Sequence, residues 1–354
     1  NRAFERAGIE SRLSFDHELM GATAYSEFGL RLMREKSNDT RIRATRDQDR
    51  TGTNDRHRVD EANSVAAYAQ TRFSPTERLA ITPGIRVESY EQTRTILTAL
   101  NDRATTKNTE VLPGIGATYE LNTSAQVYGG VYRAFSPASN DVALDGLTDQ
   151  ELDGERSTNY EIGVRGSTEQ ANFEVAAFYM NFSNQVVTGN SNPNLSKSNA
   201  GKTEHLGMEF VFGYNLGHGF SLDTNATWVP TSEFKTGDYA GNRLPYAPKI
   251  VGNIGLNYTA DKFSATLNVH HRGEQFGSPE NTVAIPDEAA GGIWGGQLPA
   301  YTIMDIMAEY QVTPKLSVQG SVKNLTDKEY IAGLRQGIYV GPERAFQVGV
   351  RYSF

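Results

Sequence analysis

Six arginines are the residues of this chain whose type and spacing best suit a defined chemistry. They crowd into one short polar stretch, at Arg41, Arg43, Arg46, Arg50, Arg56 and Arg58. A guanidinium group is planar and always charged, and it binds a carboxylate through two parallel hydrogen bonds. The chain carries a formal net charge of −8, so an anionic ligand must find cations that are gathered locally. The stretch is therefore a candidate anion site.

Other groups of residues give weaker indications of chemistry. The acidic run from Asp141 to Glu155 could bind Ca²⁺, but its spacing differs from an EF-hand loop, which favours a hydrated lid. The glycine-rich run at 289–296 lacks the following Lys-Ser/Thr of a phosphate loop. His270 and His271 are neighbours on an expected strand, so they point to opposite faces and cannot share a metal. No histidine lies beside a nucleophile signature, so we expect neither an enzyme nor a protein-bound metal.

Composition excludes several classes of protein. The 354 residues include no cysteine, which excludes disulfides and thiolate metal sites. The acidic balance argues against a nucleic-acid partner, which needs a basic stripe. The longest run of apolar side chains, Val175 to Met180, is far too short for a membrane-spanning helix. Asn1 to Glu10 do not resemble a signal peptide, so we expect that a leader was cleaved or that the sequence begins internally.

Alternation of apolar and polar residues is the clearest structural signal. Near the C-terminus Phe346, Val348, Val350, Tyr352 and Phe354 share one face of an expected strand, and polar residues or glycine occupy the other. Segments 250–258 and 263–270 alternate in the same way. Extended to the whole chain, the pattern predicts fifteen strands, at 6–18, 22–37, 60–74, 79–97, 110–121, 123–136, 157–168, 171–187, 203–216, 219–234, 246–259, 263–275, 300–312, 315–325 and 343–354.

Connections between these strands alternate between tight turns and long polar loops. The long loops are expected near 38–59, 98–109, 137–156, 188–202, 235–245, 276–299 and 326–342. Short turns on one rim and long loops on the other are typical of an all-β transmembrane antiparallel β-barrel of the outer membrane. Tyr119, Tyr258, Tyr310 and Phe354, at strand ends, fit an interfacial aromatic girdle. Single-chain bacterial barrels have even strand numbers, so fifteen predicts part of a larger barrel.

Several motifs resemble one family along nearly the whole chain. They occupy Arg50–Thr53, Ile81–Glu88, Thr158–Arg165, Asn181–Gln185, Gly201–Glu209, Gly241–Lys249, Gln275–Phe276, Asn281–Val283, Val322–Tyr330, Gly337–Gly341 and Phe354. In this order they resemble the TonB-dependent receptors, most closely the branch of ferric dicitrate receptors. The resemblance implies a barrel of 22 strands plugged by an N-terminal domain. Residues 1–354 would then be the C-terminal barrel portion, without the plug and the first seven strands.

The resemblance also implies a ligand site. Three positions that contact the ligand in that branch map onto Asp47, Asn190 and Leu334. Arginines flank the two positions that lack a donor, so the expected ligand residues are Arg46, Arg50, Asn190 and Arg335. An alternative is that the loop arginines only pair with neighbouring aspartates or with lipopolysaccharide phosphates.

The function implied is import of a ferric chelate, ferric dicitrate or a related siderophore, across the outer membrane of a Gram-negative bacterium. Iron would arrive inside its chelate rather than as a bound cofactor. The expected partners are the TonB-ExbB-ExbD complex, reached through the plug, and lipopolysaccharide with the surrounding outer-membrane lipid. A passive porin and a TonB-dependent receptor for another substrate remain alternatives.

Overall fold

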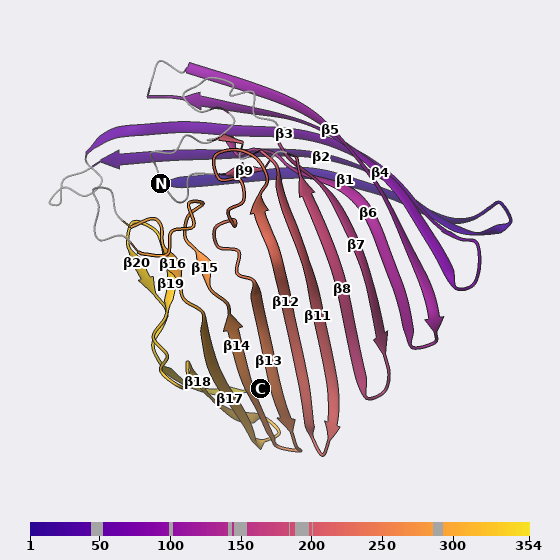
Figure 1. Cartoon of the computed structure of the whole chain (residues 1–354), viewed down its shortest axis with the longest axis vertical. Coiled ribbons are helices and arrows are strands. Elements are labelled where there is room, and N and C mark those ends of the chain that lie inside the picture. Colours follow the sequence, from indigo (N-terminus) through magenta and orange to yellow (C-terminus); the bar gives the residue numbers. More distant parts are fainter. Residues whose placement is uncertain are drawn as a thin grey trace.

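A computed structural model describes residues 1–43, 52–98, 102–140, 144, 154–183, 185–187, 198–199, 201–285 and 293–354. Within these ranges, no helix has the length and apolarity needed to span a bilayer. The main feature is a single curled sheet of 15 strands (Figure 1).

Each strand of this sheet pairs antiparallel with its neighbours in chain order. The strands are β1 (Arg2–Leu19), β2 (Ala22–Arg43), β3 (Thr53–Ser74), β4 (Leu79–Ile96), β5 (Asp102–Asn122), β6 (Ala125–Ser136), β7 (Glu155–Ser167), β8 (Ala171–Phe182), β11 (Thr203–Gly217), β12 (Phe220–Phe234), β13 (Ile250–Thr259), β14 (Phe263–Arg272), β17 (Tyr301–Thr313), β18 (Leu316–Lys323) and β21 (Ala345–Tyr352). All fifteen predicted strands are confirmed. Among the described residues, β1 pairs only with β2 and β21 only with β18, so the 15-stranded sheet is open, as the odd number predicts.

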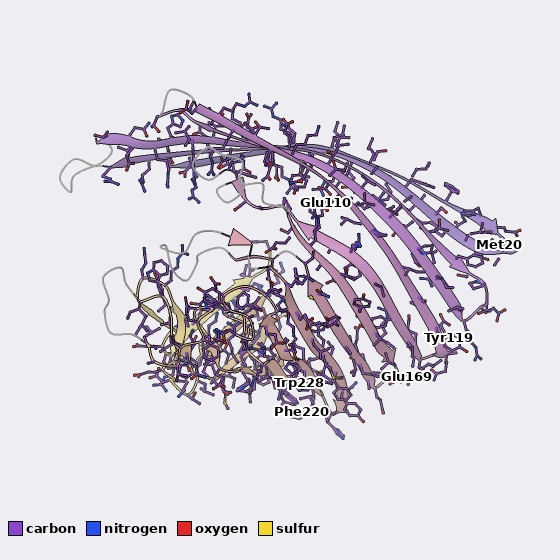
Figure 2. The ribbon with its side chains drawn as sticks, turned by 45° about the horizontal axis from the view of Figure 1, so that its top comes forward. Met20, Glu110, Tyr119, Glu169, Phe220 and Trp228 are labelled. Carbon is purple, nitrogen blue, oxygen red and sulfur yellow. The ribbon has the colours of Figure 1, made fainter. Side chains whose placement is uncertain are left out.

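Tight turns join the strands at one rim of the sheet, where Met20, Tyr119, Glu169 and Phe220 lie (Figure 2). Local chemistry explains them. Met20 and Gly21 have φ values of 52° and 77°, which a two-residue hairpin turn requires. At another turn the Thr168 hydroxyl accepts a hydrogen bond from the backbone N–H of Ala171 at 3.0 Å. The longer connections all leave from the opposite rim.

The two faces of the sheet differ as the alternation predicts. Val348 and Val350 are 79% and 67% exposed on the outward face. On the other face Arg351 Nη1 lies 3.9 Å from Glu309 Oε1. His270 and His271 do point to opposite faces, because His270 Nδ1 is hydrogen-bonded to Asn253 and His271 Nδ1 to Thr302. Because the two rings lie on opposite faces of the sheet, they cannot both bind one metal ion.

Several predicted strand ends were wrong, and β8, for example, ends at Phe182 rather than at residue 187. The largest errors lie beside two of the loops. The loops expected at 38–59 and 98–109 are shorter, because β2 continues to Arg43, β3 begins at Thr53 and β5 begins at Asp102. Outside the membrane both faces of a strand can be polar, so pairing continues where alternation no longer shows it. Cross-strand ion pairs, such as the fork from Arg41 to Asp55 at 3.0 and 2.9 Å, stabilise these extensions.

Short strand pairs lie within the long connections. They are β9 (Val186–Val187) with β10 (Ser198–Asn199), β15 (Gln275–Phe276) with β16 (Gln297–Leu298), and β19 (Ile331–Leu334) with β20 (Ile338–Val340). These pairs were not predicted, because two to four residues carry no readable period. Leu298 and Leu334 are almost fully buried here, so the connections near the C-terminus pack into a small core of their own.

Arg243 and Asn281 join two of these connections. Arg243 donates to the carbonyls of Ala247, Pro230 and Val229 at 2.6, 3.0 and 2.6 Å. The Asn281 side chain accepts from the Arg243 N–H at 2.7 Å and donates to the Arg243 carbonyl at 2.8 Å. Burial lowers the pKa of Arg243, although its carbonyl partners keep it satisfied as a cation. Both residues belong to motifs that carried the family resemblance, and in this structure their hydrogen bonds join the β12–β13 connection to the β14–β17 connection.

We expect two variants of Asn281 to separate its hydrogen bonds from its backbone conformation. Asn281 has a φ of 54°, which glycine tolerates and alanine does not. Asn281→Gly should lose only the side-chain hydrogen bonds, about 1–3 kcal/mol for the orphaned groups. Asn281→Ala should lose more, because it adds strain of about 1 kcal/mol. Hydrogen exchange at 241–249 in the full-length receptor measures both. Equal protection in the two variants would contradict the prediction that alanine adds backbone strain at this φ.

A second pair of variants tests the assignment of faces. Ile254 is on the outward face and 51% exposed, whereas the Asn257 side chain donates to Asp223 at 2.7 Å on the other face. Ile254→Arg should destabilise the receptor in lipid by about 2–4 kcal/mol, because a charge then faces hydrocarbon. Asn257→Arg keeps a carboxylate partner and should have little effect. Chemical unfolding in bilayers gives the comparison, and a larger loss at Asn257 would reverse the assignment.

Candidate anion-binding site

Five arginines surround two aspartates where β1, β2 and β3 extend beyond the apolar part of the sheet. We call this group the arginine cluster, and it comprises Arg2, Arg41, Arg43, Arg56 and Arg58 with Asp39 and Asp55. The register pairs Asp39 with Arg2 and with Arg58, so strand pairing alone brings residues far apart in sequence into contact. They alternate with the outward residues of the same strands and therefore occupy the concave face.

Asp39 is the centre of the first half of the cluster. Its side chain is 6% exposed, and Arg56 Nη2 and Arg58 Nε both lie 3.2 Å from its Oδ2 atom. Arg2 Nε lies 3.6 Å from Oδ1. The Nε atoms of Arg56 and Arg58 are buried and make no well-aligned hydrogen bond with the residues that the structure describes. Two of the three guanidinium groups around this carboxylate therefore keep an unfilled Nε donor.

Asp55 is the centre of the second half. Arg41 binds it with a two-pronged fork, Nε to Oδ1 at 3.0 Å and Nη2 to Oδ2 at 2.9 Å, and Arg43 Nη2 lies 3.1 Å from Oδ2. The hydrogen bonds from Arg41 are the largest cause of a lowered Asp55 pKa, and the same contacts raise the pKa of Arg41. Asp55 therefore stays ionised to a lower pH than a free aspartate, and Arg41 stays charged to a higher pH than a free arginine.

The charges of the arginine cluster do not balance, because five guanidinium groups meet two carboxylates and leave an excess of +3. Exposed ion pairs stabilise a fold by about 0–1 kcal/mol each, so stability alone does not account for the excess. A concentrated cationic field does attract anions and accelerates their encounter. The arrangement is therefore suited to meeting a polycarboxylate or another multivalent anion.

Of the expected ligand residues, the structure describes only Arg335. It lies in the turn between β19 and β20, with an exposed side chain and its backbone N–H donating to the Gly337 carbonyl at 3.0 Å. Arg46, Arg50 and Asn190 lie outside the described residues, as does most of the acidic run 141–155. Arg46 and Arg50 belong to the segment that joins β2 to β3, and both ends of that segment start from the arginine cluster. No group of three or more His, Asp or Glu residues suited to a metal ion occurs in the described part of the chain.

Four described arginines of the cluster were missed as site residues. Arg41, Arg43, Arg56 and Arg58 were noted in the arginine-rich stretch but were not chosen, because the family positions pointed to Arg46 and Arg50. The signal that could have found them is the pairing of β2 with β3, which sets Arg41 opposite Arg56. Arg2 carried no such signal, since its contact with Asp39 depends on the register of β1.

Comparisons with known proteins agree with this architecture. The family model described as "TonB dependent receptor-like, beta-barrel" matches residues 2–325. The pesticin receptor of Yersinia pestis is 26% identical over 282 residues, which cover 76% of this chain and 40% of that protein. The vitamin B12 transporter BtuB of Photobacterium profundum is 24% identical over 304 residues, 84% of this chain and 46% of the relative.

Solved structures share the fold at low sequence identity. The unliganded ferric citrate transporter FecA superposes with a TM-score of 0.84 and 23% identity, over 99% of this chain and 55% of that one. The chain thus spans about half the length of the relatives it matches. The match of the family model over most of its length, together with the sheet described above, shows that this chain belongs to the TonB-dependent receptors, the β-barrel receptors of the Gram-negative outer membrane.

Proposed function

We propose that the receptor containing this chain imports an anionic ferric chelate into the periplasm, with ferric dicitrate as the first candidate and a related siderophore as the second. The observation that carries the proposal is the +3 excess of the arginine cluster at the end of the sheet opposite the tight turns. In this family, ligands arrive at the rim that bears the long loops. Ferric dicitrate is a polycarboxylate anion, and guanidinium forks are well matched to its free carboxylates.

Names of similar proteins support the class of substrate. They include a ferric citrate transporter, a ferric yersiniabactin uptake receptor and a ferripyoverdine receptor. A vitamin B12 transporter also matches, so a substrate without iron is the main competitor. Vitamin B12 carries no cluster of carboxylates, so an excess of arginine would not strengthen its binding. The charge of the site therefore favours the ferric chelate.

The remaining parts of the proposal concern the whole receptor. We propose that residues 1–354 form the C-terminal portion of a 22-stranded barrel, with the plug and the first strands supplied by preceding sequence. The TonB-ExbB-ExbD complex would act through that plug, and lipopolysaccharide with other outer-membrane lipid would surround the barrel. Iron is cargo inside its chelate, and the chain acts as a transporter rather than an enzyme.

Ligand binding tests the site. Arg46, Arg50, Asn190 and Arg335 are proposed to contact the chelate, with the arginine cluster behind them. Each charge-assisted hydrogen bond is worth about 1.5–3 kcal/mol, so Arg46→Ala or Arg335→Ala should weaken ferric dicitrate binding by about ten- to a hundredfold. Arg58→Gln should weaken it as well, and Arg165→Gln, a matched loss of charge elsewhere on the sheet, should not.

Binding by the purified full-length receptor is measured by intrinsic fluorescence or calorimetry, with a neutral hydroxamate complex as the comparison ligand. Preference for dicitrate that disappears in the arginine variants is the expected result. If dicitrate binds the variants as tightly as the wild type, the arginines are not ligands. Tight binding of vitamin B12 instead would replace the proposed substrate.

Energy coupling separates an active receptor from a passive porin. Uptake of radioactive iron chelate by cells that carry the receptor should stop when the tonB gene is deleted or the proton-motive force is dissipated, because the described barrel offers no energy source of its own. Binding to the cell surface should persist, which gives an internal control. Uptake that continues at an undiminished rate in the deletion strain would favour the porin.

A further inference from the structure

β5 and β6 separate partway along their length and leave a cleft between them. Their pairing runs from Asn122 only as far as Gly114. Beyond Gly114, β5 continues alongside β4 to Asp102, whereas β6 continues alongside β7 to Ser136. A cavity of about 500 Å³ lies in this opening, and its lining includes Glu110, Arg133, Arg156, Thr158, Asn181 and Lys202.

The lining of this cleft is cationic. Arg133, Arg156 and Lys202 contribute three positive charges, and Glu110 is the single acid. Glu110 is already engaged, because the Arg156 guanidinium binds it at 2.7 to 3.0 Å in a nearly buried position. Neither Arg133 nor Lys202 forms an ion pair within the part of the chain that the structure describes. Counted over the described residues that line it, the cleft thus holds an excess of two positive charges.

An apolar groove begins directly beneath the cleft on the outward face. The register aligns Arg133, Thr158 and Asn181 in one row across the sheet, and Val131, Tyr160 and Tyr179 in the next. The groove has a volume of about 730 Å³, and small residues at Ala117, Gly129 and Ala177 hollow its floor. Its walls include Ile162 and Leu206, which are 62% and 45% exposed.

The tyrosines mark where the groove meets the cleft. The rings of Tyr160 and Tyr179 lie 5.9 Å apart on the outward face. Tyrosine favours the boundary between hydrocarbon and lipid headgroups. Residues one row further from the turns, on the same face, therefore lie at headgroup height, so the cleft meets lipid headgroups and the groove meets lipid chains.

We propose that the cleft and the groove together bind one phosphorylated acyl lipid of the outer leaflet, the chemistry of lipopolysaccharide. A lipid phosphate would lie between Arg133 and Lys202, with Thr158 and Asn181 as further donors, and an acyl chain would fill the groove. This site gives a position to the lipid partner of the proposed function, but it does not depend on which chelate is imported.

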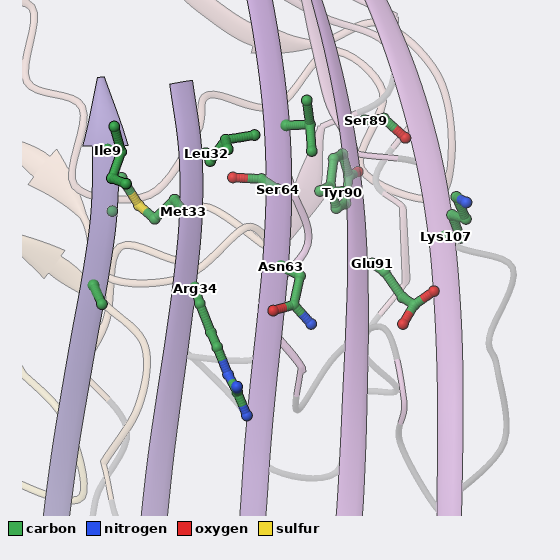
Figure 3. Close-up of a pocket in the computed structure, with 13 residues that line it drawn as sticks. Ile9, Leu32, Met33, Arg34, Asn63, Ser64, Ser89, Tyr90, Glu91 and Lys107 are labelled. Atoms are coloured by element: carbon green, nitrogen blue, oxygen red, sulfur yellow. The ribbon is translucent and has the colours of Figure 1, made fainter. Parts of the chain in front are cut away.

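A second hollow on the outward face shows why the cleft is distinctive. It lies over β1 to β5, has a volume of about 590 Å³, and also combines apolar residues with cations, Arg34 and Lys107 (Figure 3). Here the charges are balanced, because Arg34 Nη2 donates to Glu61 at 3.0 Å and Glu91 stands opposite Lys107 in the ladder. The hollow in Figure 3 therefore lacks an excess of charge for a phosphate and serves as a matched control.

The test uses the full-length receptor, purified in detergent and exposed to lipid A that carries two phosphates. Native mass spectrometry counts the lipid retained. The wild type should retain it, and Arg133→Gln/Lys202→Gln should bind it about tenfold more weakly or worse, because two charge-assisted contacts are lost. Arg34→Gln/Lys107→Gln removes the same charge from the same face and should bind as the wild type does. Arg133→Lys keeps the charge and should retain most of the binding.

Two further arms decide the source of the phosphate. Lipid A with its phosphates removed should bind weakly, and millimolar inorganic phosphate should fail to displace the intact lipid. Equal binding of the phosphate-free lipid, or complete displacement by inorganic phosphate, would overturn the proposal, as would unchanged retention in Arg133→Gln/Lys202→Gln. Ferric dicitrate binding, measured on the same samples, should be unchanged, so failure of the lipid site is distinguishable from failure of the chelate site.

Discussion

Backbone hydrogen bonding in hydrocarbon is the constraint on which this structure depends. No water is present there to satisfy a free N–H or C=O group, so each strand must pair with a neighbour on both sides. The continuous ladder from β1 to β21 gives every internal strand a neighbour on each side, although β5 loses its pairing with β6 beyond Gly114. Pairing in turn fixes the alternation of faces, since a shift of one residue would turn Val348 and Val350 away from lipid. The apolar face, the polar face and the tight turns all follow from it.

Outside the hydrocarbon this constraint no longer applies, because water can satisfy free backbone groups. Attraction between charged side chains then determines which residues contact one another. The extensions of β2, β3 and β5 keep their pairing but carry few apolar side chains, and those of β2 and β3 hold the arginine cluster together with Arg2 of β1. An excess of cations is tolerable there because water and salt screen it. Side chains suited to binding a ligand therefore lie at the ends of the strands, whereas contact with lipid constrains the residues in the central part of each strand.

The difference between strand segments inside and outside the hydrocarbon explains which parts of the fold could be predicted from the sequence. Segments such as 263–270 alternate strictly, because one face meets lipid, and they were placed correctly. Where both faces meet water, as from Asn38 to Arg43, nothing in the pattern distinguishes a strand from a loop. Longer-range contacts were also hidden. Arg243 and Asn281 are 38 positions apart, and only the fold shows that their motifs fasten one connection to another. The same holds for Asp39 of β2, whose partners come from two other strands, β1 and β3.

The parting of β5 from β6 also has a mechanical consequence. Along the stretch from Asp102 to Pro113, β5 is hydrogen-bonded on one side only, to β4. A sheet under tension or heat opens first where its ladder is thinnest, because fewer bonds must break together. We therefore expect any separation of β1–β5 from β6 and the strands beyond to begin near Gly114. Loss of pairing between β5 and β6 would then precede loss of pairing in the rest of the sheet.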